Sequence, residues 1–303
     1  MKHVMIFGAG QAGQMTAAWL TGDQILDGFI DNNEQLQGSE IDGIPVYSTD
    51  EAFKTGMPDQ IWLAVINREA CEQIREQLRC AGYTGEITSV HEVRSKIDLR
   101  LASFRLLAEQ IKERDIPGSI AELGVYQGAF AAELNRVFPE RKLYLFDTFD
   151  GFDEEDLLTE RKLGGRNAFA AAGDFSDTSV EIVLGKMRDP ASVYICKGRF
   201  PDSLSKGAIK AEGETTVTET NLKAERFAGV SLDTDLYEPT LAGLHFFYPR
   251  LNPGGFILLH DYRSAQYPGV HRAAVEFFKE YGLYCVPLAD LHGTAVIIKG
   301  QAQ

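Results

Sequence analysis

The stretch Ser119-Ile120-Ala121-Glu122-Leu123-Gly124-Val125-Tyr126-Gln127-Gly128 decides the fold of the larger part of this chain. An apolar run that reads as a short buried strand ends in a turn with two glycines, and a helical pattern follows. Glycine lets the backbone turn sharply and lets a ligand approach the main chain closely. A buried strand, a glycine turn and a helix predict a βα unit of a parallel sheet, with the turn at the carboxyl edge of the sheet.

The spacing of this turn indicates which ligand it binds. Glu122, Gly124 and Gly128 have the E-x-G-x-x-x-G form of a loop that binds S-adenosylmethionine rather than a dinucleotide. Asp147 ends the next strand, and a carboxylate there offers two acceptors in one plane to the hydroxyls of a ribose. The predicted cofactor-binding residues are Glu122, Gly124, Tyr126, Gly128, Asp147 and Thr148.

Two pairs of side chains that can bind a metal ion follow later strands of the same sheet. Asp233 and Asp235 follow one of these strands. His260 and Asp261 follow the next one. Because ligand sites of open α/β sheets lie at the carboxyl ends of the strands, we expect these side chains to converge near the methyl group of the cofactor.

Carboxylates together with one imidazole suit a divalent ion such as Mg²⁺ or Mn²⁺. A hydroxyl group is a poor nucleophile and a weak acid. A divalent ion would lower the pKa of an acceptor hydroxyl, and a nearby carboxylate or histidine would then take its proton. The strand-end residues therefore predict a metal-assisted transfer to oxygen.

Five ordered blocks characterise this region of the sequence. They are Glu122-Leu123-Gly124-Val125-Tyr126-Gln127-Gly128, Asp147-Thr148-Phe149-Asp150-Gly151-Phe152, Lys197-Gly198-Arg199-Phe200-Pro201-Asp202-Ser203-Leu204, Leu232-Asp233-Thr234-Asp235-Leu236-Tyr237-Glu238-Pro239-Thr240, and the run from Pro253 to Tyr262. Together they resemble the macrocin O-methyltransferase family, whose members methylate sugar hydroxyls on macrolide and aminocoumarin antibiotics. The resemblance covers roughly residues 116–278 and implies a class I S-adenosylmethionine methyltransferase with a Rossmann-like α/β fold. It also makes Asp233 a metal ligand and the base, and Asp261 a second ligand.

The chain departs from this family at one place. Where the family usually carries two aspartates, this sequence has His260-Asp261. Imidazole binds Mg²⁺ poorly, so the difference favours either a transition metal or a site without metal in which His260 is the base. We therefore predict Asp233 and His260 as catalytic residues, and these two with Asp261 as metal ligands.

A second glycine turn lies near the N-terminus. Gly8, Gly10 and Gly13 form a G-x-G-x-x-G pattern between a short strand and a helical segment. In such a turn the first glycine allows the bend, the second lets a phosphate approach, and the third lets the helix pack on the strand. Asp31 ends the next strand, where an acid meets ribose hydroxyls. The predicted nucleotide-binding residues are Gly8, Gly10, Gln11, Gly13 and Asp31.

This N-terminal stretch resembles a small Rossmann-like domain found on some bacterial sugar-modifying enzymes, including sugar acetyltransferases of glycan assembly. The resemblance is carried by Gly28-Phe29-Ile30-Asp31-Asn32 and Gly43-Ile44-Pro45-Val46. It implies a binding or docking module for a nucleotide or a nucleotide sugar. We expect residues 1–92 to form this small α/β domain and residues 93–303 to form the methyltransferase domain.

The composition argues against several classes of partner. The formal net charge is −14 and the sequence pI is about 4.9. Such a surface would repel phosphate backbones and anionic lipids, so neither nucleic acid nor a membrane is an expected partner. The four cysteines match neither a zinc site nor a redox pair, and no signal peptide is recognisable, so a cytoplasmic protein is expected. The expected acceptor is a small molecule or a glycan, and the family resemblance implies a homo-oligomer.

Two segments interrupt the alternation of strands and helices. Residues 153–173 are polar and charged, and residues 205–224 lack periodicity. Long irregular segments in a compact domain are often lids or binding loops, and both segments are read here as such insertions. Two last strands, near 284–287 and 294–299, predict an antiparallel finish to the sheet.

Two other functions fit parts of the sequence. A binding protein that keeps both nucleotide pockets but has no transfer activity would explain His260 in place of the usual aspartate. An NAD-dependent oxidoreductase would use the turn from Gly8 to Asp31, although no residues for hydride transfer can be identified.

Overall fold

The computed structural model describes residues 1–163, 170–212 and 216–301. The chain forms two compact units, each described below by itself. The N-terminal unit consists of Met1–Leu99 with Ala289–Leu291, and the C-terminal unit of Arg100–Leu288 with His292–Gln303. Among the described residues, no helix has the length and the apolar character that crossing a membrane requires.

The N-terminal unit is a parallel sheet with helices on both faces. Its described strands are β1 (Lys2–Phe7), β2 (Gln24–Ile30), β3 (Glu40–Ile41), β4 (Ile44–Tyr47), β5 (Gln60–Leu63) and β6 (Glu86–Ser89), in the spatial order β3-β4-β2-β1-β5-β6. Its helices are α1 (Gln11–Ala17), α2 (Thr49–Thr55), α3 (Arg68–Cys80) and α4 (Val90–Arg94). All pairings are parallel except that of β3 with β4. Apolar side chains of α2 and α3 pack on one face of the sheet, and those of α1 and α4 pack on the other.

The three glycines of the first turn differ in what requires them. Gly8 has a φ of +104°, which L side chains rarely adopt. A Cβ at Gly13 would lie 1.8 Å from the carbonyl oxygen of Gly8, so the helix packs on the turn only without a side chain there. A Cβ at Gly10 would meet nothing within 4 Å, so the space beside this residue is open.

The C-terminal unit is built around a larger mixed sheet. Its described strands are β7 (Ser119–Leu123), β8 (Leu143–Asp147), β9 (Val193–Lys197), β10 (Ala208–Lys210), β11 (Thr216–Val217), β12 (Phe227–Leu232), β13 (Leu251–Leu259), β14 (Val286–Pro287) and β15 (Ala295–Ile298). Their spatial order is β11-β10-β9-β8-β7-β12-β13-β15-β14. The five central strands β9, β8, β7, β12 and β13 are parallel. β15 is antiparallel to β13 and pairs with β14 as an antiparallel hairpin, which confirms the predicted finish of the sheet.

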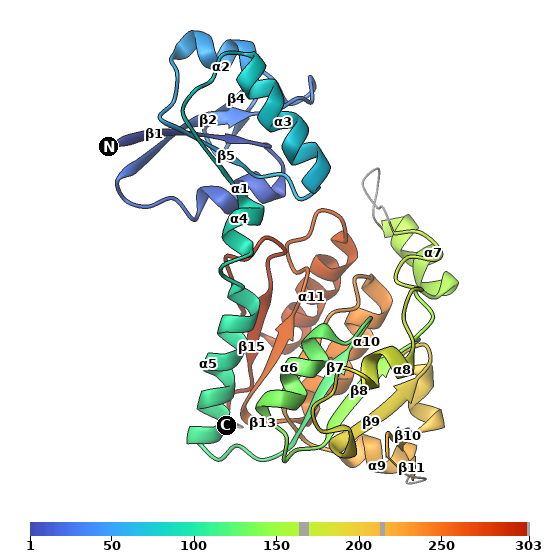
Figure 1. The fold of residues 1–303 in the computed structure, drawn as a ribbon. Helices are drawn as coiled ribbons and strands as arrows, with labels where there is room; N and C mark the ends of the chain where they lie inside the picture. The colour runs from blue at the N-terminus through green and yellow to red at the C-terminus, as the bar shows by residue number, and fades with distance from the viewer. Residues whose placement is uncertain (164–169, 213–215, 302–303) are drawn as a thin grey trace. The chain divides into compact units, whose positions relative to one another are not determined.

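Helices cover both faces of this sheet (Figure 1). They are α5 (Leu99–Glu113), α6 (Ala129–Val137), α7 (Glu154–Leu163), α8 (Val180–Leu184), α9 (Glu219–Ala224), α10 (Tyr237–Phe247) and α11 (Pro268–Tyr281). Successive side chains of a strand point to opposite faces. Thus Ile120 of β7 packs with the core under α5, α6 and α8, whereas Ala121 and Leu123 pack with the core under α10 and α11.

The boundaries of α11 follow from local chemistry. Pro268 occupies the first turn, where its missing N–H costs nothing. Gly282 ends the helix in the left-handed conformation with a φ of +64°. Gly269 at the start of the helix leaves room for the buried carboxylate of Glu160, which accepts a hydrogen bond from the Gly269 N–H at 2.9 Å.

The reading of the two insertions as irregular loops is wrong for most of the described residues. The segment 205–224 contains β10 and β11, which continue the sheet beyond β9, and α9. These elements are too short to show a period in the sequence. The segment 153–173 contains α7, whose Glu160 also accepts a hydrogen bond from the N–H of Tyr237 at 2.9 Å. Residues 164–169 lie outside the described part of the chain.

Candidate active site

The glycine turn after β7 is held against the end of β12. Gly124 has a φ of +84°, and a Cβ there would lie 1.9 Å from the carbonyl oxygen of Asp233. The Asp233 N–H donates to the Leu123 carbonyl at 2.8 Å. Because β7 and β12 are neighbours, the predicted cofactor turn and the predicted catalytic aspartate lie side by side. Gly128 begins α6 with a φ of +75° and packs against Val183.

Asp147 organises the same turn from the end of β8. Its Oδ2 accepts hydrogen bonds from the N–H groups of Val125 at 2.6 Å and Tyr126 at 3.0 Å, and its Oδ1 accepts one from Phe149 at 2.7 Å. The carboxylate thus fixes the loop that the sequence predicts to hold the cofactor. Contact of Asp147 with a ribose stays a prediction. Thr148, beside it, donates to the Gly151 carbonyl at 2.6 Å and lines the same cavity.

Glu122 is a buried carboxyl group inside β7. Its side chain is paired through Oε1, which accepts from the Ser231 hydroxyl at 3.2 Å, while the buried Oε2 has no hydrogen-bond partner. Burial raises the pKa of Glu122 to about 8, although the nearby Arg100 guanidinium lowers it. Glu122 is therefore a carboxyl group that carries a proton over much of the neutral pH range.

The structure brings the predicted catalytic and metal-binding residues together. Nδ1 of His260 lies 2.9 Å from Oδ1 of Asp233 and 2.6 Å from Oδ2 of Asp261. Burial alone would lower the pKa of His260, but the two carboxylates raise it to about 10. Without a bound ion the ring therefore carries a proton at neutral pH between these carboxylates, and a metal that binds Nδ1 would displace this proton.

The same charges shift the pKa values of the three aspartates near His260. Burial would raise the pKa of Asp233, but His260 and Arg100 lower it to about 2. The pKa of Asp261 is lowered as well, since His260 and His292 outweigh its burial. The pKa of Asp235, by contrast, is raised well above its usual value by burial and by the charges of Asp261 and Asp233.

Arg100 is a site residue that the sequence analysis missed. Its Nη1 donates to Oδ2 of Asp233 at 2.8 Å, and its Nη2 donates to the hydroxyl of Ser231 at 3.0 Å. The guanidinium also lies over the ring of Phe130, 4.2 Å from its centroid. Arg100 stands at the start of α5, where the sequence pattern shows only the apolar stripe of a connecting helix.

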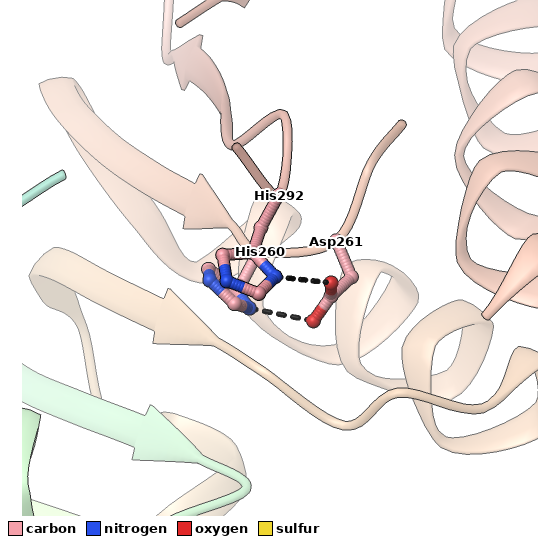
Figure 2. Close-up of side chains that lie close together, drawn as sticks. All are labelled: His260, Asp261 and His292. Atoms are coloured by element: carbon pink, nitrogen blue, oxygen red, sulfur yellow. Dashed lines mark hydrogen bonds and ion pairs between the residues drawn. The ribbon is translucent and has the colours of Figure 1, made fainter. Parts of the chain in front are cut away.

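His292 is the second residue that the sequence analysis missed. It lies in the loop between β14 and β15, and Figure 2 shows its ring beside that of His260, with both facing Asp261. The ring centroids of His260 and His292 are 4.9 Å apart, and Nδ1 of His292 lies 3.4 Å from Oδ1 of Asp261. A histidine in a short hairpin-like turn carries no signal of a site in the sequence.

These groups border one cavity with a volume of about 480 Å³. Its lining includes Arg100, Glu122, Gly124, Tyr126, Asp147, Thr148, Asp233, Asp235, His260, Asp261 and His292. The residues fit a divalent ion, because the buried Oδ1 of Asp261 has no hydrogen-bond partner and belongs to two groups of potential ligands. One group is Asp233, Asp235 and Asp261, and the other is His260, Asp261 and His292.

In the N-terminal unit, the predicted nucleotide-binding residues surround a similar turn. Asp31 accepts hydrogen bonds from the N–H groups of Ala9 at 2.7 Å and Asn33 at 2.8 Å. The side-chain amide of Gln11 lies 3.8 Å from the sulfur of Met15. Within the described residues, neither group of potential metal ligands lies in this unit. Nucleotide binding by Gly8, Gly10, Gln11, Gly13 and Asp31 stays a prediction.

Comparison with known proteins places the C-terminal unit among methyltransferases. A tetracenomycin-C derivative 4'-O-methyltransferase of Streptomyces olivaceus is 27% identical over 208 residues, which are 65% of this chain and 71% of that protein. Mycinamicin III 3''-O-methyltransferase of Micromonospora griseorubida is 26% identical over 200 residues, or 61% of this chain and 69% of that protein.

Solved structures show the same fold. The O-methyltransferase NovP has 21% identity and a TM-score of 0.51, over 67% of this chain and 80% of that one. The calicheamicin methyltransferase CalS11 has 20% identity and a TM-score of 0.51, over 78% of this chain and 88% of that one. These neighbours confirm the predicted methyltransferase fold. Residues 93–299 match the profile of the macrocin-O-methyltransferase family, and this chain therefore belongs to that family.

Proposed function

We propose that this protein is an S-adenosylmethionine-dependent O-methyltransferase that acts on a sugar hydroxyl. The acceptor is a glycan, a nucleotide sugar or a glycosylated natural product. The observation that carries this proposal is the contact between the glycine turn at Gly124 and the strand end at Asp233, because it joins a cofactor loop to a proton acceptor in one cavity. The relatives' names support this proposal, since both are O-methyltransferases and one name gives a rhamnosyl-tetracenomycin as the acceptor.

The cofactor would be held by Glu122, Gly124, Tyr126, Gly128, Asp147 and Thr148. When bound, S-adenosylmethionine supplies a methyl group on a positively charged sulfur. Asp147 fixes the turn through the N–H groups of Val125 and Tyr126, so the main chain is already ordered for a ligand. An ordered site loses less conformational entropy when it binds its ligand.

Asp233 is the proposed proton acceptor. Its carboxylate lines the cavity and is oriented from two sides, by Arg100 on Oδ2 and by His260 on Oδ1. A base that is held in place by its neighbours contributes to both orientation and proton transfer. His260 connects Asp233 with Asp261 and would exchange the proton with solvent after transfer.

We also propose that a divalent ion assists the reaction. Asp233, His260 and Asp261 would hold it, and Mg²⁺ or Mn²⁺ is the ion that carboxylate ligands favour. A bound ion would lower the pKa of the acceptor hydroxyl.

For the N-terminal region, residues 1–92, we propose a nucleotide-binding domain that accompanies the methyltransferase domain of residues 93–303. The open space at Gly10 and the carboxylate of Asp31 beside the turn favour this assignment. A nucleotide sugar bound there would be an acceptor or its precursor.

The test is methyl transfer from S-adenosylmethionine with a labelled methyl group to a panel of nucleotide sugars, free sugars and glycosides. The expected result is a labelled methyl ether on one class of acceptor, located by mass spectrometry. Binding of the cofactor without transfer to any acceptor in a broad panel would instead favour a binding protein. Nicotinamide absorbance in the purified protein would favour the oxidoreductase.

A further inference from the structure

The cavity offers two sets of ligands for a divalent ion, and they differ in chemistry. One set is the three carboxylates of Asp233, Asp235 and Asp261. The other set combines Asp261 with the imidazoles of His260 and His292 (Figure 2). In each set the potential ligand atoms lie within 4.8 Å of one another. Since Asp261 belongs to both sets, the two sites compete for it.

The protein's own cations oppose an ion in the carboxylate set. Nη1 of Arg100 lies 2.8 Å from Oδ2 of Asp233, so this carboxylate oxygen is already paired with a cation. Arg100 is permanently charged and almost buried, with 14% of its side chain exposed, so it repels a second cation at that carboxylate. No such contact with an arginine or lysine is recorded for Asp261 among the described ion pairs.

The histidine set has the features of a site for a transition metal. Both rings present a nitrogen to one buried carboxylate, at 2.6 Å for His260 and at 3.4 Å for His292. Ligand atoms of a four-coordinate zinc ion are about 3.4 Å apart, so closing this set needs side-chain movements of only about 1 Å. Imidazole nitrogens suit Zn²⁺, Fe²⁺, Co²⁺ and Ni²⁺, whereas Mg²⁺ prefers oxygen ligands and water.

We infer that His292 completes a site of two histidines and one aspartate with His260 and Asp261. This site binds a transition metal that favours nitrogen ligands more tightly than it binds Mg²⁺, and Zn²⁺ is the probe for such a metal. The inference rests on the proposed function of the cavity. It replaces Asp233 by His292 among the ligands of the proposed ion and changes the kind of ion. Three protein ligands would leave a coordination position free for an acceptor hydroxyl, and all three residues line the cavity.

The test measures metal affinity with the full-length protein. The samples are prepared without a histidine tag, which would itself bind zinc. The exposed Cys80 is replaced by serine in every sample so that its thiol does not bind zinc. After removal of metals with a chelator, Zn²⁺ binding is measured by competition with a zinc indicator and Mg²⁺ binding by calorimetry. His292→Gln is compared with His245→Gln, because His245 also lies 3.4 Å from a single carboxylate but outside the cavity.

We expect Zn²⁺ to bind with a stoichiometry of about one and at least about 100-fold more tightly than Mg²⁺. His292→Gln should weaken Zn²⁺ binding about 10- to 100-fold and leave Mg²⁺ binding unchanged, whereas His245→Gln should change neither. Pulsed electron paramagnetic resonance of Cu²⁺ bound to the protein that retains both His245 and His292 should show two imidazole nitrogens as ligands.

Tighter binding of Mg²⁺ than of Zn²⁺ would overturn the inference, and so would equal Zn²⁺ affinities of His292→Gln and His245→Gln. A Cu²⁺ spectrum with one imidazole nitrogen or none would also overturn it, whatever the fold of the variants. Binding of S-adenosylhomocysteine to the metal-free protein is measured in parallel. If the metal-free protein does not bind S-adenosylhomocysteine, the proposed function is contradicted. If it binds S-adenosylhomocysteine but does not bind Zn²⁺ more tightly than Mg²⁺, only the inferred metal site with His292 is contradicted.

Discussion

The two glycine turns of this protein share one design and differ in what surrounds them. In the N-terminal unit, Asp31 accepts hydrogen bonds from the main chain of the turn after β1. In the C-terminal unit, Asp147 does the same for the turn after β7. In both sheets the acid lies at the carboxyl end of the neighbouring strand. The chain adds further strands on that side and only then crosses to the other side of the first strand. Such a switch point is where open α/β sheets bind ligands.

The strands on the far side of the switch point make the difference. After β5, Asn67 accepts a hydrogen bond from the Ala70 N–H at 2.9 Å and caps α3. After β12 and β13 stand Asp233, His260 and Asp261, which form a charged cluster. A glycine turn thus predicts an architecture that can hold a nucleotide. The chemistry depends on the residues that end the strands beside it.

The largest expected effect is on kcat, which should fall after substitution of an acid in the C-terminal unit but not after substitution of the corresponding acid in the N-terminal unit. Asp233→Asn removes the proposed proton acceptor, so kcat for methyl transfer should fall about 10²- to 10⁴-fold. Asp31→Asn, at the corresponding acid of the N-terminal unit, should leave kcat at saturating acceptor unchanged, because it lies outside the cavity that holds Asp233. Steady-state kinetics with labelled cofactor measures both variants, and circular dichroism checks that Asp233→Asn is folded. A kcat for Asp233→Asn within a factor of three of the wild-type value would show that another group takes the proton.

The next effect is on the free energy of unfolding, which should respond differently to alanine at Gly124 and at Gly10. Gly124→Ala places a Cβ against the backbone of Asp233 at a residue with a φ of +84°, so it should destabilise the protein by at least about 3 kcal/mol. Gly10→Ala has a φ of −70° and open space, so its effect on stability should stay within about 1 kcal/mol. Denaturant unfolding of both variants provides the measurement. Equal destabilisation by the two substitutions would contradict the close contact of β7 with the end of β12.

The smallest effect concerns the pH dependence of stability. The pKa of Glu122 is raised from its usual value of 4.5 to about 8 in the folded protein, so the folded state binds more protons between these values. Its contribution to stability is therefore fully present below about pH 4.5 and is lost as the pH rises through 8.

Glu122→Gln should remove this contribution. Between pH 6 and pH 7.5, the free energy of unfolding of the wild-type protein should fall more steeply than that of the variant, by up to about 1.4 kcal/mol per pH unit. Urea unfolding at several pH values gives both slopes. Parallel slopes would mean that Glu122 is ionised in the folded protein.

The sequence predicted those features that depend on local spacing. The turn at Gly124, the acid at Asp147 and the convergence of Asp233 with His260 all follow from strands that end at one edge of a sheet. Arg100 and His292 could not be predicted in this way, because a helix start and a short loop have no periodic signal that points to a site. The elements between residues 205 and 224 were missed for a related reason, since strands of two or three residues are too short to show alternation.

A binding experiment can decide which of the two glycine turns holds the methyl donor. S-adenosylhomocysteine is titrated by calorimetry into the wild-type protein, Asp147→Ala and Asp31→Ala. We expect one bound ligand for the wild type, an affinity weakened about 10- to 100-fold in Asp147→Ala, and an unchanged affinity in Asp31→Ala. Unchanged binding in Asp147→Ala together with loss of binding in Asp31→Ala would contradict this expectation.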